Sequence, residues 1–360
     1  ALICMLCASS SLRAESAYEE IREKVSTLAG SDYAKPLILA VTKQGRPVFG
    51  VAITDPTAPI KSKARIVIVA GQHGNEPCAA HAAAELALRW ASEEGFADLR
   101  RNAMVLIIPA ANPDGLAHGT RSGSSGVDPN RDWSRLSLVE TRTIARAIEE
   151  WKPHLILDKH EWSQTDGYRF DCVELSGVAP DQSLVELGKR IRANAMPAEF
   201  SAVDSLPGRN PSLFHRRFLA KGYLTYLIET SPEESPAAKQ RHYIQLSMSL
   251  ARQAVAHRER IEACSAAGRQ HELPEQVAGW RERRSPVAQK AAFGVEAVVG
   301  MAALYCLLLL SAQMKRPMAR WRREERLLAP RRACVPATPF GVLPEITCRS
   351  RASRQGRRGR

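Results

Sequence analysis

Short runs of apolar, β-branched residues alternate with helical patterns along most of this chain. The runs at 66–70 and 104–110 are each followed by polar residues, and the stretch 154–160 ends in polar residues. Unbroken apolar runs of this length are typical of strands that are buried on both faces. Strands that alternate with helices predict an α/β fold, with a mixed, largely parallel central sheet that has helices on both faces.

Turn and capping signals divide the rest of the pattern into elements. Residues 43–46 predict a hairpin turn, and Ser137 with Glu140 has the spacing of a helix-capping box. Residues 112–136 are rich in Gly, Ser, Asp and Arg and predict a long loop, which in a compact domain usually has a function. The expected strands are 36–42, 47–53, 66–70, 104–110, 154–160, 170–175 and 223–229, and the expected helices are 17–29, 78–94, 137–151, 181–193 and 237–263.

The same pattern predicts how the chain is divided. Residues 1–14 resemble the end of a secretory signal, and 15–266 carry the alternating strands and helices. A polar stalk at 267–290 leads to the apolar run 291–312, which is long enough to span a membrane. Residues 313–360 form a basic tail with the composition of a disordered segment. We therefore expect an exported main domain, periplasmic or extracellular, that a C-terminal helix anchors to the inner membrane.

Charge and cysteine content narrow the function classes. The tail after residue 312 holds 14 Lys and Arg against 3 Asp and Glu, a net of +11 out of +13, so the remainder carries only +2. A nearly neutral main domain gives no reason to expect a nucleic-acid partner. Its three cysteines, Cys78, Cys172 and Cys264, lack CxxC spacing, which excludes a zinc ribbon and allows at most one disulfide.

The candidate chemistry begins where the strand 66–70 ends. His73 and Glu76 follow it at H-x-x-E spacing, and open α/β sheets place their sites at the carboxyl ends of strands. Zinc hydrolases use three protein ligands and keep one position open for water. His160, at the end of another buried strand, is placed to be the third ligand. Taken singly, each histidine has a plainer interpretation as a packing or surface residue.

Three further positions suit catalysis and substrate binding. Glu229 ends an apolar strand, where a carboxylate is costly unless it is used or paired, so it is a candidate general base. The alternative is a carboxylate at the start of a helix. Arg121 and the pair Asn130 and Arg131 lie in the predicted loop, and a guanidinium can bind a carboxylate or an oxyanion. Any one of these arginines taken alone suits the surface equally well.

Five motifs in order, GQHGNEP, ANPDG, GTRSGSSGVDPNRDW, LDKHEW and LIET, make residues 60–255 resemble the zinc carboxypeptidase (M14-type) metallopeptidase family. The resemblance is greatest to its shorter bacterial members, such as murein-peptide amidases. It implies a carboxypeptidase-like α/β fold. It also implies zinc-dependent hydrolysis of a peptide or amide bond next to a free carboxylate, on cell-wall peptides among other substrates.

The resemblance carries over residue by residue to a metal centre. It implies one Zn²⁺ per chain, held by His73, Glu76 and His160. Glu229 matches the residue that acts first as general base and then as general acid. Asp128 matches the carboxylate that orients the first zinc histidine through its second ring nitrogen.

For the substrate, the resemblance implies a second group of residues. Arg121 matches the arginine that polarises the scissile carbonyl, and Asn130 and Arg131 match the pair that holds the terminal carboxylate. Tyr168 is a candidate for the tyrosine that covers the substrate in digestive carboxypeptidases, although no motif marks it. Arg209 belongs to a basic segment that we expect to line the side-chain pocket and to favour acidic substrates; its other arginines are Arg216 and Arg217.

Two other functions remain open at the level of sequence. One is an N-acyl amino acid deacylase of the succinylglutamate desuccinylase and aspartoacylase type, whose members share H-G-N-E and the N-R element. The other is a membrane-tethered, non-catalytic peptide-binding protein. The NPDG motif and the intact catalytic positions favour the peptidase. The expected partner is a peptide or acylated amino acid with a free carboxylate, together with a membrane at 291–312.

Overall fold

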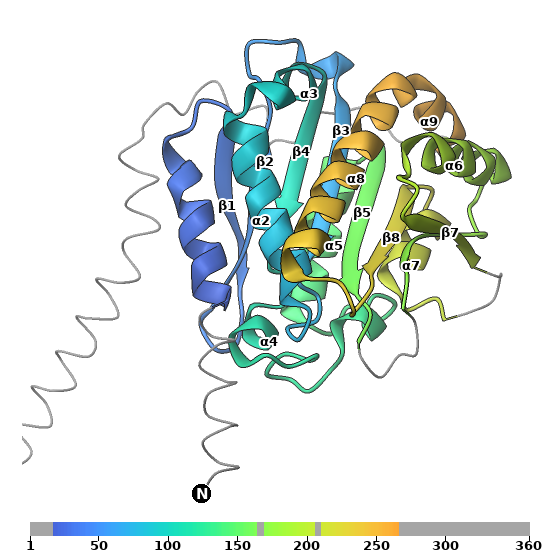
Figure 1. Ribbon diagram of the computed structural model, residues 1–360. Helices are drawn as coiled ribbons and strands as arrows, with labels where there is room; N and C mark the ends of the chain where they lie inside the picture. Colours follow the sequence, from blue (N-terminus) through green and yellow to red (C-terminus); the bar gives the residue numbers. More distant parts are fainter. Residues whose placement is uncertain (1–16, 164–168, 206–209, 266–360) are drawn as a thin grey trace, which may run out of the picture. The chain divides into compact units, whose positions relative to one another are not determined.

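The computed structural model describes residues 17–163, 169–205 and 210–265. Within them, eight strands form one sheet in the order β1-β2-β4-β3-β5-β8-β6-β7 (Figure 1). The strands are β1 (Ala34–Val41), β2 (Pro47–Ile53), β3 (Ala64–Ala70), β4 (Ala103–Ile108), β5 (Leu155–Glu161), β6 (Asp171–Ser176), β7 (Phe200–Ser205) and β8 (Leu224–Thr230).

Helices connect most of the strands. Residues 17–26 are helical and precede β1. The α-helices after them are α2 (Pro77–Ser92), α3 (Ala97–Asn102), α4 (Pro113–His118), α5 (Val139–Trp151), α6 (Gln182–Ala195), α7 (Phe214–Ala220), α8 (Pro236–Ala256) and α9 (Arg258–Cys264). Short 3₁₀ turns are η1 (Thr27–Gly30), η2 (Ile60–Ser62), η3 (Glu94–Phe96) and η4 (Pro129–Arg131).

The sheet is mixed, as the sequence predicts. Strands β4, β3, β5 and β8 pair in parallel, while β1 and β2 form the predicted antiparallel hairpin at one edge. Strand β6 pairs antiparallel with β8 and parallel with β7. The carboxyl ends of β3, β5 and β8 therefore lie together at one edge of the sheet. The first residues of β6 lie beside the end of β8.

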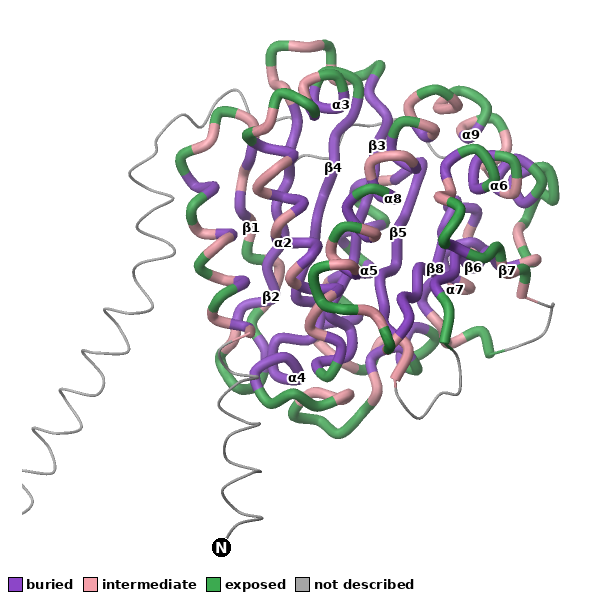
Figure 2. Tube along the Cα trace, in the orientation of Figure 1, coloured by how far each residue is buried: buried purple, intermediate pink, exposed green. Residues whose placement is uncertain are grey.

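Two hydrophobic cores lie on the two faces of this sheet. Alternate side chains of β3 divide between them, with Ile66 and Ile68 in one core and Val67 and Val69 in the other. Helices α2, α6 and α8 cover the first face, and α5 and α7 cover the second, as Figures 1 and 2 show. The central strands are buried along their full length, which is why apolar residues fill most of β3 and β4 and the first half of β5.

Some local expectations were wrong. The segment 112–136 is not structureless, because α4 begins at Pro113, where the Asn112 side chain accepts a hydrogen bond from Gly115 N at 2.9 Å and caps the helix. Ser137 does not cap α5, since its hydroxyl donates to Asp132 instead. The expected helix 237–263 is two helices that meet at His257.

Other expected features fall outside the described residues: the signal remnant 1–14, the stalk 267–290 with the run 291–312, and the basic tail 313–360. Within the described part of the chain, no helix is both long and apolar enough to cross a membrane.

Candidate metal centre and active site

The first two candidate ligands stand on a turn that requires glycine. Gly71 leaves β3 with φ of +68°, a conformation that other residues rarely adopt. At Gly74, a Cβ atom would lie 1.9 Å from the backbone of Gly115, and Gly74 N donates to Thr120 O at 2.9 Å. The turn therefore packs directly on α4, and this packing fixes where His73 and Glu76 point.

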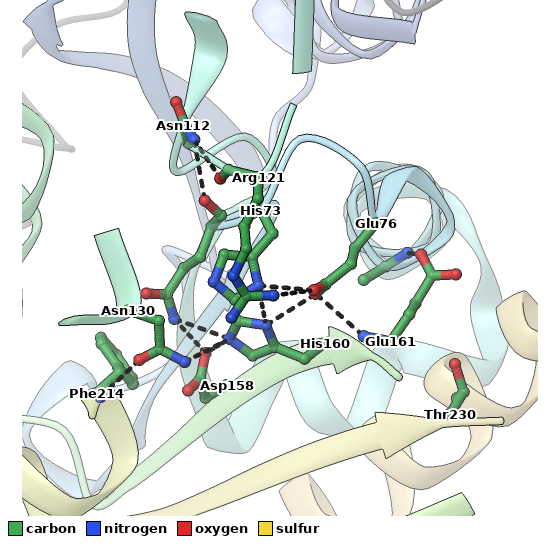
Figure 3. Close-up of polar contacts among 12 residues, drawn as sticks. His73, Glu76, Asn112, Arg121, Asn130, Asp158, His160, Glu161, Phe214 and Thr230 are labelled. Carbon is green, nitrogen blue, oxygen red and sulfur yellow. Dashed lines mark hydrogen bonds and ion pairs between the residues drawn. The ribbon is translucent and has the colours of Figure 1, made fainter. Parts of the chain in front are cut away.

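His73, Glu76 and His160 converge on one point (Figure 3). The Nδ1 atom of His73 lies 2.7 Å from one Glu76 carboxylate oxygen, and the Nδ1 atom of His160 lies 2.9 Å from the other. The two Nδ1 atoms are 3.2 Å apart. All three side chains are buried. Two imidazole nitrogens and a carboxylate form a donor set that zinc accepts, so the residues fit the ion that the sequence predicts.

Each histidine has a carboxylate behind its other ring nitrogen. Asp128 Oδ1 lies 3.0 Å from Nε2 of His73, as the resemblance implies. Asp158 Oδ1 lies 3.2 Å from Nε2 of His160 and accepts a hydrogen bond from the Gln72 amide at 2.6 Å. Such contacts fix the tautomer of a metal-ligating histidine. Sequence reasoning missed Asp158, although a carboxylate two residues before His160 in a buried strand was a usable signal.

The electrostatics of the centre favour charged carboxylates. Burial by itself would raise the pKa of Glu76, but the imidazoles of His73 and His160 hold that pKa well below its usual value. Burial likewise opposes the charge on Asp128, and His73 together with Arg121 lowers its pKa. For His160, burial would lower the pKa, and the neighbouring carboxylates raise it instead. Anionic oxygens at this centre are what a cation needs.

The candidate base lies one strand further along the sheet. Glu229 is the register partner of His160 in the parallel pair of β5 and β8, and of Cys172 in the antiparallel pair with β6. It is 8% exposed and lines the same cavity as His73 and Glu76. Glu229 is far from His160 in the sequence, and the pairing of β5 with β8 brings the two residues together.

The predicted substrate-binding residues reach the site in different ways. Arg121 lines the cavity with 40% of its side chain exposed; its Nε donates to Asp128 at 2.9 Å, and its Nη1 lies 3.5 Å from Glu76. Arg131 also lines the cavity and is exposed. Asn130, by contrast, is buried. Its Oδ1 accepts a hydrogen bond from Phe214 N at 2.9 Å, and its Nδ2 lies 3.3 Å from His160.

A cavity of about 460 Å³ opens onto this centre. Its walls come from the ends of β5 and β8, from β6 and β7, and from the start of α7. Beyond the predicted site residues, the lining consists of Glu161, Trp162, Phe170, Cys172, Glu174, Val203, Asp204, Ser205, Leu213, Arg216 and Leu227.

The pocket walls hold acidic as well as basic groups. Arg216, from the basic segment, lines the cavity, and its Nη2 donates to Glu174 at 2.9 Å. His215 Nε2 also lies 3.0 Å from that carboxylate. Glu174 and Cys172 were not singled out from the sequence, since neither carries a motif. Arg217 is not among the lining residues. The preference for acidic substrates stays a prediction, and Tyr168 and Arg209 lie outside the described residues.

Comparison with known proteins shows which proteins this domain is similar to. A family model described as "Zinc carboxypeptidase" matches residues 27–204. Carboxypeptidase 2 of Trichophyton tonsurans is 33% identical over 106 residues, which is 29% of this chain and 20% of the fungal protein. Murein peptide amidase A of Escherichia coli K12 is 33% identical over 102 residues, which is 28% of this chain and 39% of the amidase. The chain thus spans well under half the length of these relatives.

Solved structures support the fold. A metallo-carboxypeptidase from Pseudomonas aeruginosa matches with a TM-score of 0.57 and 22% identity, covering 66% of this chain and 68% of that one. A metallo-carboxypeptidase from Burkholderia cenocepacia matches with a TM-score of 0.54 and 19% identity, covering 66% and 68%. At these identities the likeness concerns the fold alone. The family match, together with the ordered motifs, shows that residues 27–204, just under half of the chain, are similar to zinc carboxypeptidases.

Proposed function

We propose that this chain is a zinc-dependent hydrolase that cleaves a peptide or amide bond next to a free carboxylate. One observation carries the proposal. Three metal-ligating side chains converge at the edge of the sheet, and a carboxylate on the next strand, Glu229, lines the same cavity. The match of residues 27–204 to the zinc carboxypeptidase family model supports the choice of ion and reaction.

The residues of the site divide the chemistry between them. Zinc, when bound by His73, Glu76 and His160, supplies a Lewis acid that polarises a carbonyl and acidifies water. Glu229 takes a proton from the attacking water and returns it to the leaving nitrogen. The guanidinium of Arg121 stabilises the negative charge that develops on the carbonyl oxygen.

Recognition of the free carboxylate rests mainly on Arg131. Its guanidinium is exposed and lines the cavity, and Nη1 donates to Asn130 O at 2.9 Å. The Asn130 side chain is already engaged with the Phe214 amide and faces His160. Asn130 therefore acts chiefly by holding α7 and the third metal ligand in place. An arginine forms a bidentate pair with a carboxylate, which sets the position of the scissile bond.

For the substrate, we propose peptides of the bacterial cell wall. The similarity to murein peptide amidase A supports this choice, and so does the export predicted from the N-terminal sequence. The mixed charges on the cavity wall, from Glu174, Asp204 and Arg216, suit a polar or charged side chain better than an apolar one.

The first test is Glu229→Gln in the full-length chain. We expect kcat/KM on N-acylated dipeptides and on murein peptides to fall by about 10²–10⁴-fold, because the proton acceptor is lost. Bound zinc, measured by mass spectrometry, should be unchanged. Glu199→Gln, at an exposed position, is the matched control. Full activity in Glu229→Gln, or a wild-type chain that binds no zinc, would overturn the proposal.

A substrate panel separates the remaining functions. Free-acid peptides should be cleaved in preference to the same peptides with C-terminal amides, since only the former carry the carboxylate. Cleavage confined to short N-acyl amino acids would identify a deacylase. Peptide binding without turnover by the zinc-loaded chain would identify a non-catalytic protein.

A further inference from the structure

A second group of metal-ligating side chains lies outside the active site. Asp171 is the first residue of β6, Glu234 lies between β8 and α8, and His242 is on α8. The Nδ1 atom of His242 is 2.8 Å from Asp171 Oδ2 and 3.0 Å from Glu234 Oε2. Three donor atoms from three separate segments thus point at one another.

The distances from His242 Nδ1 to the two carboxylate oxygens are similar to the distances within the catalytic centre. There, the contacts between His73, Glu76 and His160 measure 2.7 to 3.2 Å. Donor atoms that bind one ion from different directions come this close to each other. The second group has the same kind of donors, with one imidazole and two carboxylates in place of two imidazoles and one.

The one hydrogen on His242 Nδ1 cannot form hydrogen bonds to both carboxylates of the second group. His242 Nδ1 carries at most one hydrogen, and its hydrogen bond goes to Asp171. The Glu234 Oε2 atom is buried and accepts no hydrogen bond from the described residues, although 28% of the Glu234 side chain is exposed. Buried polar atoms without a partner are rare, and a bound ion is one explanation for them.

The surrounding charges leave room for a cation. Burial and the like charge of Asp171 raise the pKa of Glu234. The nearby Lys239 donates to Glu161 at 2.9 Å and so is bound elsewhere. Arg241 also lies near enough to act on Glu234. The Asp171 side chain is only 3% exposed, and a buried carboxylate needs a nearby positive charge.

We propose that Asp171, Glu234 and His242 form a second, structural site for a divalent transition-metal ion of the Zn²⁺ class. The imidazole selects such an ion over Ca²⁺ and Mg²⁺, which take oxygen ligands. The two carboxylates together neutralise the double positive charge of such an ion. The proposal is independent of the proposed function, because none of the three residues lines the cavity.

The position of the site gives it a role. Asp171 Oδ1 accepts a hydrogen bond from Ser231 N at 2.7 Å, two residues after Glu229. An ion here joins the start of β6, the segment that follows β8 and helix α8. It therefore fixes the end of the strand that carries Glu229, while Phe170, next to Asp171, lines the cavity.

Metal content tests the proposal directly. The full chain, loaded with Zn²⁺ and dialysed, should hold two ions by mass spectrometry, and His242→Ala and His160→Gln should each hold one. His118→Ala, at an exposed histidine, is the matched control and should hold two. One ion in the wild type, unchanged in His242→Ala, would show that the group is only an ion pair around a protonated histidine.

A second measurement does not depend on stoichiometry. In the His160→Gln chain, which lacks one of the three catalytic ligands, added Zn²⁺ should still raise the unfolding temperature, because ligand binding stabilises the folded state. Adding Glu234→Gln should abolish that rise while leaving the zinc-free unfolding temperature close to its former value. An equal rise in both chains would overturn the proposal. Loss of hydrolysis alone, with two ions bound, would count against the proposed function and not against this site.

Discussion

At the scale of single residues, the metal centre depends on side chains behind the ligands. Gln72 illustrates this, because its amide nitrogen donates to Asp158 and its oxygen accepts from Trp133 at 2.8 Å. The H-x-x-E pair was predictable, since both ligands sit on one turn. Asp158 lies two residues before His160 on the same strand, so a local signal for it was present. Gln72 follows a different strand and becomes a partner of both only when β3 and β5 pair. No local pattern in the sequence contains that information.

Replacement of Asp158 should weaken metal binding without removing a ligand. In Asp158→Asn, His160 loses the carboxylate that fixes its tautomer, and we expect zinc affinity to fall by about 10–100-fold. Competition with a chromogenic chelator measures this. Asp98→Asn, on the surface, should leave the affinity unchanged. Equal affinity in the wild type and Asp158→Asn would show that Gln72 alone orients the ring.

Glu174 gives a pH-dependent prediction. Burial alone would raise its pKa, but hydrogen bonds and charge from His215 and Arg216 lower it from 4.5 to about 2. The unfolded chain binds a proton near pH 4.5, so the stabilisation is complete above that pH and is lost as the pH falls toward 2.

We therefore expect Glu174→Gln to cost on the order of 3 kcal/mol in free energy of unfolding at pH 7, by linkage. The difference from wild type should shrink as the pH falls from 4.5 to 2. Urea unfolding at a series of pH values measures it, and Glu199→Gln serves as the control. A difference that is constant across this range would mean that shape, and not charge, is what Glu174 contributes.

At the scale of elements, the strongly periodic segments were predictable and the short ones were not. Helix α7 is seven residues long and reads as a basic stretch; the Asn130 side chain binds its first amide. Strand β7 is at the edge of the sheet, so its partly exposed FSAVDS sequence lacks a buried apolar run. Helix α4 was hidden because Asn112 and Pro113 signal both a turn and a capped helix start.

The contact between the ligand turn and α4 gives the next prediction. In Gly74→Ala, the new Cβ would lie 1.9 Å from the backbone of Gly115, which cannot yield as a flexible side chain would. We expect a loss of at least 1–3 kcal/mol in stability, as for other overpacked sites, together with weaker zinc binding.

The matched control is Gly95→Ala, where a Cβ would meet nothing within 4 Å. Thermal unfolding and zinc titration of both variants measure the effects. Should the two variants behave alike, the close packing of the turn against α4 would not be what positions His73 and Glu76.

At the scale of the whole domain, the alternation of strands and helices predicted the sheet and its covered faces. It did not predict the strand order, because β6 reverses direction beside β8. That reversal depends on which strands pair, and pairing partners far apart in sequence leave no periodic signal. The metal ligands come from two strands, β3 with its following turn and β5, so metal binding ties neighbouring parts of the sheet together.

Removal of metal should therefore destabilise the domain. A ligand present at about 1,000 times its dissociation constant stabilises by about 4 kcal/mol, which in a domain of this size corresponds to roughly 10 °C in unfolding temperature. We expect a chelator to lower the unfolding temperature by that order, and added Zn²⁺ to restore it. Scanning calorimetry measures both. An unchanged unfolding temperature would mean that the centre is rigid without its ion.

The reversal at β6 also has an evolutionary consequence. The metal ligands and Glu229 lie on parallel strands in the middle of the sheet or on the turn after one of them, whereas β6, β7 and α7 supply about a third of the residues of the cavity wall. Mutations in those outer segments can retune selectivity while the reaction machinery is inherited unchanged. A lineage built on this scaffold can thus explore new substrates without passing through inactive ancestors.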